Sequence, residues 1–295
     1  MELLSEWIGY DSPAGAVAGY LVRPRAVSGP APGVVVIQEV WGVDGHIADV
    51  ADRFANAGYV ALAPDLYSVG GGRPPTLAVE RVAAAKAFLN TIPTAQWMAV
   101  LGDEQRRAEA LSTLPADEAQ EVGETIGALF GGVGGDPARH VGVLRAAVAF
   151  LRAHPACAGR AVGSVGFCLG GGLSALLAGE EPELGAAVIF YGASPSAEQV
   201  GSIHCPLRGF YGHDDPRIVT RLPAFDAALG AAGVDYELRI YPDTPHAFFN
   251  DTRPSYRPEA ARDAWGRTLA FFAEALGPVP TVPVPEAVSA DAGQP

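Results

Sequence analysis

The sequence predicts an α/β fold in which helices cover both faces of a mostly parallel central sheet. Short apolar runs alternate with segments of helical periodicity, an order that is typical of parallel strands joined by crossover helices. The apolar runs are nearly continuous, as expected for strands that are buried on both faces. The chain has 295 residues, of which 49% are hydrophobic, enough for one large sheet with a substantial core.

The elements follow from local patterns. Residues 33–38 form a β-branched apolar run behind a Pro/Gly breaker, and residues 46–57 then place apolar side chains at helical spacing. Residues 16–22 are expected to add an antiparallel strand at the edge of the sheet. The buried strands that we expect are residues 33–38, 59–63, 161–167, 186–191, 207–211 and 236–241. The other expected helices are residues 173–177, 222–232 and 258–276.

The segment before strand 161–167 is longer than one crossover helix requires. Residues 76–153 carry helical patterns and are interrupted by the glycine-rich run 131–137. We therefore expect one domain over residues 1–276, with residues 76–153 as a helical insertion or lid. The proline-rich end, residues 277–295, is expected to be a flexible tail.

The composition of the chain excludes some classes of binding partner. The net charge of −13 argues against nucleic acid and anionic membranes as binding partners. Neither a membrane-spanning apolar stretch nor a signal peptide is recognisable. The three cysteines, Cys157, Cys168 and Cys205, are odd in number and irregularly spaced, which favours reduced thiols. We therefore expect a cytoplasmic protein, monomer or homodimer, that acts on a small molecule.

Residues 165–172 carry the strongest functional signal. The run Val-Gly-Phe-Cys-Leu-Gly-Gly-Gly matches the Gly-x-nucleophile-x-Gly elbow of α/β-hydrolases, with Cys168 in place of the usual serine. Small neighbours are required because the nucleophile is held on a tight, strained turn. The N–H of Leu169 then points to the reacting centre at a helix N-terminus. Ser164 and Ser174 lie within a predicted strand and helix, so neither has this turn geometry.

Two later strands are followed by an acid and a histidine, at the edge where open parallel sheets bind ligands. Asp214 and Asp215 follow strand 207–211, and His246 follows strand 236–241. The order nucleophile, acid, histidine is that of α/β-hydrolases. His246 is expected to take the thiol proton, and one of the two aspartates to orient its imidazole. The residues alone leave the choice of aspartate open.

The run Gln38-Glu39-Val40-Trp41-Gly42 follows the first buried strand. Glu39 would lie among apolar neighbours near the elbow, so we prefer a site role to a surface loop. The Val40 N–H is the expected second donor to an oxyanion. A metal site around His204 and His213 matches no ligand spacing, so no metal is expected.

Together these residues resemble the dienelactone hydrolase (carboxymethylenebutenolidase) family of α/β-hydrolases, over residues 1–276. The matching segments are Gln38-Glu39-Val40-Trp41-Gly42, Gly58-Tyr59-Val60-Ala61, Ala63-Pro64-Asp65-Leu66-Tyr67, Gly166-Phe167-Cys168-Leu169-Gly170-Gly171, Tyr211 through Asp215, and His246-Ala247-Phe248-Phe249-Asn250. The resemblance implies hydrolysis of an activated ester or lactone, such as dienelactone to maleylacetate, without metal or organic cofactor.

The resemblance also implies roles for single residues. It implies a triad of Cys168, His246 and Asp215, with Glu39 assisting activation of the thiol. The amides of Val40 and Leu169 would form the oxyanion hole. The alternative is an α/β-hydrolase-fold protein that binds a small molecule without turning it over, but such a protein need not keep nucleophile, acid and histidine at these strand ends.

Substrate contacts depart from the family pattern. Characterised members hold the substrate carboxylate with two arginines, one of them four positions after the histidine, where this chain has Asn250. The other arginine has Arg107 or its neighbour Arg106 as a candidate. Arg253, in the following loop, is an alternative source of the missing contact, but we expect it to form a salt bridge on the surface. Trp41 and Tyr67 are expected to line the substrate pocket.

Overall fold

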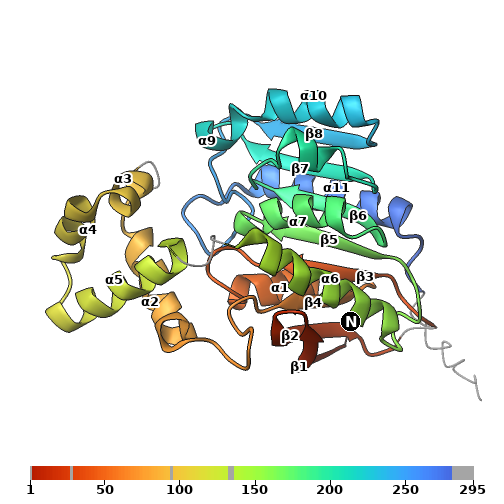
Figure 1. Cartoon of the computed structure of the whole chain (residues 1–295), viewed down its shortest axis with the longest axis horizontal. Coiled ribbons are helices and arrows are strands. Elements are labelled where there is room, and N and C mark those ends of the chain that lie inside the picture. The colour runs from red at the N-terminus through yellow and green to blue at the C-terminus, as the bar shows by residue number, and fades with distance from the viewer. Residues whose placement is uncertain (1, 27–28, 94–95, 132–135, 281–295) are drawn as a thin grey trace, which may run out of the picture.

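The computed structural model describes residues 2–26, 29–93, 96–131 and 136–280, so most of the expected tail lies outside the described residues. An eight-stranded sheet runs through the molecule in the order β1-β2-β4-β3-β5-β6-β7-β8 (Figure 1). The strands are β1 (Leu3–Ser12), β2 (Gly15–Pro24), β3 (Gly33–Ile37), β4 (Val60–Pro64), β5 (Val162–Phe167), β6 (Leu184–Phe190), β7 (Leu207–Gly212) and β8 (Tyr236–Tyr241). Neighbouring strands from β4 to β8 run parallel, which confirms the predicted mostly parallel sheet.

The antiparallel edge is wider than the sequence indicated. β1 and β2 form a hairpin, and β2 joins the sheet beside β4, so β1 is the edge strand. β1 was not predicted because its only buried side chain is Tyr10, and the strand shows no apolar run. An edge strand that is largely exposed to solvent lacks the pattern by which buried strands are recognised.

Helices cover the two faces of the sheet. They are α1 (Gly45–Asn56), the 3-10 turn η1 (Pro75–Leu77), α2 (Val79–Asn90), α3 (Trp97–Gly102), α4 (Glu104–Leu111), α5 (Ala116–Gly131), α6 (Pro137–Ala153), α7 (Leu169–Glu180), α8 (Ala197–Val200), α9 (Pro216–Val219), α10 (Leu222–Ala232) and α11 (Pro258–Ala275). One apolar cluster packs α6, α7 and α10 on one face, and a second packs α1 and α11 on the other.

The segment 76–153 divides into two parts. α6 packs on the sheet, with contacts to β1, β3 and α7. Helices α2–α5 instead gather beside the sheet, at the left of Figure 1. α2 and α5 share an apolar core with Trp41 and Tyr67, the two aromatic residues that follow β3 and β4. Whether α2–α5 act as a lid stays a prediction. Among the helices of the described residues, none is both long and apolar enough to cross a membrane.

The core on the α1–α11 face gives a test of the fold. The Phe54 side chain is fully buried, and its ring centroid lies 4.7 Å from that of Trp265 and 5.8 Å from that of Phe272. We expect Phe54→Ala to lower the free energy of unfolding by about 3–5 kcal/mol, because it leaves a cavity among these rings. Denaturant unfolding measures the change. Val79→Ala, at a side chain that is 54% exposed, is the control, and equal effects of the two substitutions would contradict this packing.

Candidate active site

Cys168 occupies the turn between β5 and α7. Its backbone has φ 54° and ψ −111°, a conformation that non-glycine residues rarely adopt. Backbone hydrogen bonds hold it there: its N–H donates to the Phe190 carbonyl at 3.0 Å, and its carbonyl accepts from the N–H groups of Gly171 at 3.1 Å and Gly172 at 3.3 Å. The half-buried thiol is thereby fixed at the carboxyl end of a central strand.

Two glycines beside Cys168 allow the close packing of this turn. A Cβ atom at Gly166 would overlap the Gly170 carbonyl group. A Cβ atom at Gly170 would overlap the carbonyls of Ile37 and Gln38, at the end of β3. The absence of side chains at these two positions brings the start of α7 against the loop that begins with Glu39.

His246 and Asp215 reach this edge of the sheet from later in the chain. His246 Nδ1 lies 2.5 Å from Oδ2 of Asp215, which lies three residues after the last residue of β7. The charge of Cys168 also raises the pKa of His246, which places the two side chains near each other. Asp214 instead contacts the exposed imidazole of His213 at 3.2 Å. Of the two candidate aspartates, the structure therefore brings Asp215 to His246.

The charges of this group reinforce one another. Burial lowers the pKa of His246, but the negative charge of Cys168 and hydrogen bonds to Asp215 and Cys168 outweigh it and raise the pKa to about 10. Burial raises the pKa of Asp215, but the hydrogen bond and charge of His246, with Arg217, bring it below its usual range. Both shifts favour a charged imidazole that faces a charged carboxylate.

Glu39 follows β3 at the same edge of the sheet, and this residue is only 2% exposed. Its Oε1 accepts a hydrogen bond from the Tyr191 hydroxyl at 3.3 Å, and its Oε2 accepts one from Asn250 Nδ2 at 2.7 Å. Burial and the charges of Glu39 and Cys168 raise the pKa of Tyr191, so its phenol stays protonated and donates. The sequence analysis missed Tyr191; its position directly after β6, at the same sheet edge, is the signal that could have found it.

The two expected oxyanion donors come from the start of α7 and from the loop after β3. Leu169 is the first residue of α7, where a backbone N–H has no acceptor within the helix. Val40 follows β3, and its carbonyl accepts a hydrogen bond from the Tyr67 hydroxyl. That bond ties the loop after β3 to the loop after β4.

The arginines lie in different surroundings. The expected surface salt bridge of Arg253 is wrong: the residue is 8% exposed, and its guanidinium carbon lies 4.2 Å from the Trp97 ring centroid and 5.8 Å from that of Trp41. No carboxylate pairs with it within the described part of the chain, because aromatic faces occupy that place. Arg107 lies on α4 and donates to the Leu101 carbonyl at 3.0 Å. In Figure 1, α4 lies on the side of the α2–α5 group that is away from the sheet.

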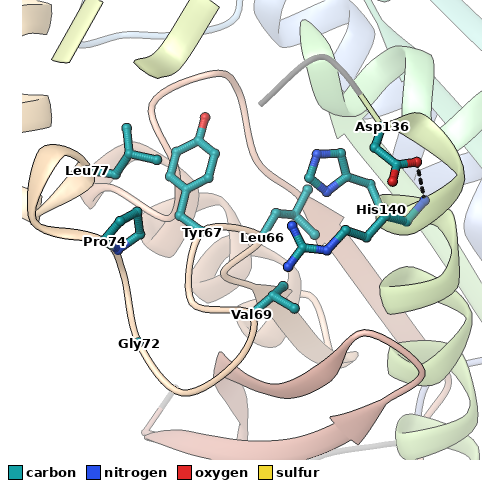
Figure 2. A pocket seen from close by; sticks show the side chains of 9 residues that line it. Leu66, Tyr67, Val69, Gly72, Pro74, Leu77, Asp136 and His140 are labelled. Atoms are coloured by element: carbon teal, nitrogen blue, oxygen red, sulfur yellow. Dashed lines mark hydrogen bonds between the residues drawn. The ribbon is translucent and has the colours of Figure 1, made fainter. Parts of the chain in front are cut away.

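Two cavities flank the site without including Cys168 or His246. The first, of about 390 Å³, has Tyr67, Leu77 and Pro74 on one side and Asp136 and His140 on the other (Figure 2). The second, of about 410 Å³, is lined by Trp41 together with residues of α1 and α2. Tyr67 and Trp41 each line one cavity, and their role toward a substrate stays a prediction. In the described ranges, no three His, Cys, Asp or Glu residues are grouped so that they could hold a metal ion.

Known proteins resemble the chain over nearly its whole length. The model of the dienelactone hydrolase family matches residues 17–276. A protein of Saccharolobus solfataricus named "Putative carboxymethylenebutenolidase" is 33% identical over 273 residues, which cover 90% of this chain and 96% of that protein. A protein of the same name from Escherichia coli K12 is 30% identical over 264 residues, covering 86% and 80% of the two chains.

Solved structures agree with this result. A "Putative Dienelactone Hydrolase" from Klebsiella pneumoniae superposes with a TM-score of 0.70 at 26% identity, covering 93% of this chain and all of that one. A dienelactone hydrolase from Anabaena variabilis gives a TM-score of 0.62 at 16% identity, covering 94% of this chain and 100% of that chain. The latter shows a shared fold.

The packing at the turn can be tested with two glycines. Gly166→Ala is expected to lower the free energy of unfolding by at least about 2 kcal/mol, because its methyl group overlaps a backbone carbonyl. Gly172→Ala is the matched control, since a methyl group there would meet its nearest atom, the Ala193 carbonyl oxygen, at an ordinary 3.4 Å. Denaturant unfolding compares the two, and a Gly166→Ala protein as stable as Gly172→Ala would refute the overlap.

The raised pKa of His246 predicts a pH dependence of stability. Because its pKa rises from 6.5 to about 10 on folding, the stabilisation is complete below about pH 6.5 and is lost as the pH rises toward 10. Asp215→Asn removes one cause of that shift, so we expect a smaller loss of stability over this range. Unfolding measured at a series of pH values tests this. Asp214→Asn should keep the wild-type profile, and an unchanged profile in Asp215→Asn would contradict the account.

Proposed function

Because this chain belongs to the dienelactone hydrolase family, we propose that it cleaves an activated ester or lactone through a Cys168–His246–Asp215 triad. Membership makes it a dienelactone hydrolase-like carboxylic ester hydrolase; the triad and the acyl-enzyme are the proposal. The observation that carries it is one imidazole that lies 2.5 Å from the Asp215 carboxylate and whose pKa is raised by Cys168, a residue on a turn with the backbone of a nucleophile elbow.

The first half of the reaction forms the acyl-enzyme. His246 takes the thiol proton, and the Cys168 thiolate attacks the carbonyl carbon, so that a sulfur–carbon bond forms and the carbonyl oxygen becomes negative. The N–H groups of Val40 and Leu169 stabilise that oxygen. The carbon–oxygen bond to the leaving group then breaks, and His246 returns the proton to the departing oxygen. Asp215 stabilises the imidazolium throughout.

The second half releases the product. A water molecule gives a proton to His246 and attacks the acyl carbon, and collapse of the intermediate frees the carboxylic acid and restores the thiol. A thiolate expels poor leaving groups less readily than an alkoxide does, so an enol ester or enol-lactone is the substrate class that suits Cys168. Glu39 acts together with His246 in removing and returning the proton of the Cys168 thiol.

The surroundings agree with a site for a small substrate. Trp41 and Tyr67, which follow β3 and β4, belong to the apolar core of α2–α5, so these helices would border the site within one domain over residues 1–276. Arg107 has no contact that supports a substrate role.

The three cysteines allow a direct test. Burial raises the pKa of Cys157 and Cys205 to about 12, whereas Cys168 is half-buried and beside His246. Iodoacetamide is expected to alkylate Cys168 alone and to abolish hydrolysis of p-nitrophenyl acetate. Cys168→Ala should lower kcat by at least about 10³-fold, whereas Cys205→Ala keeps the activity. Full activity after alkylation of Cys168 would end the proposal.

A further inference from the structure

We infer that Asn250 is a positioning residue for Glu39: its side-chain amide, oriented by Thr252, holds the buried carboxylate beside Cys168. The inference rests on the proposed function, in which Glu39 helps to manage the thiol proton. It assigns a task to a residue that lies four positions after His246.

The carboxylate of Glu39 is held by neutral groups alone. Each of its oxygens accepts one hydrogen bond, from the Tyr191 hydroxyl and from the Asn250 amide. No lysine or arginine forms an ion pair with it within the described residues. Asn250 is itself fully buried, in the loop that carries His246. A buried carboxylate needs such donors, and their positions set its orientation.

The orientation of the Asn250 amide follows from its other contacts. Its Oδ1 accepts from the Thr252 backbone N–H at 3.0 Å and from the Thr252 hydroxyl at 2.7 Å. A backbone N–H can only donate, so the amide oxygen must face Thr252 and the NH₂ group must face Glu39. A flipped amide would place its oxygen against the Glu39 carboxylate.

Lys86 fixes the direction of the Thr252 hydroxyl. Its ammonium group donates to Thr252 Oγ1 at 3.2 Å and pairs with Asp44 at 2.6 Å. Since an ammonium group only donates, the Thr252 hydroxyl proton is left to point at Asn250 Oδ1. Donation therefore runs in one direction, from Lys86 on α2 through Thr252 and Asn250 to Glu39.

The neutral amide has a chemical consequence. An arginine in its place would form an ion pair with Glu39, whereas an amide supplies a hydrogen-bond donor and brings no charge to the carboxylate. Loss of the amide should let the Glu39 side chain turn away. The defect should then be in kcat and not in KM, because Asn250 is buried against Glu39 and does not line either cavity.

A double-mutant cycle separates positioning from a structural role. Asn250→Ala should lower kcat for p-nitrophenyl acetate by about 10²-fold in the wild-type background, the cost of a misplaced group. In the Glu39→Gln background the same change should cost almost nothing further, because the group that it positions has already been removed. KM should stay within about twofold in each variant.

Thr252 offers a second test. Because this residue is exposed, its substitution should not disturb the packing of the core. Thr252→Val removes the hydroxyl at nearly constant shape and should lower kcat several-fold, and Thr252→Ser should restore it. Thr113→Val is the control, at another exposed threonine whose hydroxyl bonds only a nearby backbone carbonyl. If Asn250→Ala does not fold, the Thr252 pair decides the question.

The outcomes are distinct. Equal losses from Asn250→Ala in the wild-type and Glu39→Gln backgrounds would overturn the inference, as would full kcat in Asn250→Ala or in Thr252→Val. Full activity in Cys168→Ala would instead overturn the proposed function. An inactive Cys168→Ala protein together with a fully active Asn250→Ala protein would remove the inference and leave the proposed function standing.

Discussion

The left-handed backbone of Cys168 is the constraint on which the site depends. A cysteine at φ 54° is held in a sparsely populated conformation, so its neighbours must impose it. Gly166 and Gly170 allow this, because the turn leaves no room for a Cβ atom at either position. The same lack of side chains packs the first turn of α7 against the end of β3, next to Glu39 and Val40. A strained turn thereby brings the thiol, the helix N-terminus and the carboxylate loop together.

The parallel sheet supplies the other groups because its strands end at one edge. Tyr191 follows β6, Asp215 follows β7, and His246 comes a few residues after β8. These residues are far apart in the chain, and the parallel arrangement of the strands places them at the same edge of the sheet. The result is a buried network of two parts: the pair of His246 and Asp215, and the Glu39 carboxylate with its two uncharged donors. Tyr191 connects the two parts, because it donates to Glu39 and its ring centroid lies 5.1 Å from that of His246.

Elements with a regular pattern of buried residues could be predicted from the sequence. Exposed elements, and the role of a single residue among similar neighbours, could not. The strands from β3 to β8 carry apolar runs, and the elbow carries a specific glycine pattern, so both were recognised. Strand β1 was missed because it is largely exposed. Asp214 and Asp215 are adjacent in the sequence, so their pattern alone left the choice open; the family resemblance favoured Asp215, and the structure brings Asp215 to the imidazole.

Side chains whose partners come from distant elements escaped the sequence analysis. Arg253 looked like a surface cation because no local pattern shows that Trp97 and Trp41 cover it. Asn250 looked like a lost arginine because its contact with Glu39 spans 211 residues of sequence.

The central claim is that the Cys168 sulfur becomes covalently bonded to the acyl group of the substrate. Acid quenching during turnover of p-nitrophenyl acetate, followed by mass spectrometry of the intact protein and its peptides, tests this most directly. The account predicts one acetyl group per chain, on the peptide that contains Cys168, and its disappearance once the substrate is consumed. Continued turnover with the acetyl group on another residue, or with no acetylated protein at any time, would contradict it.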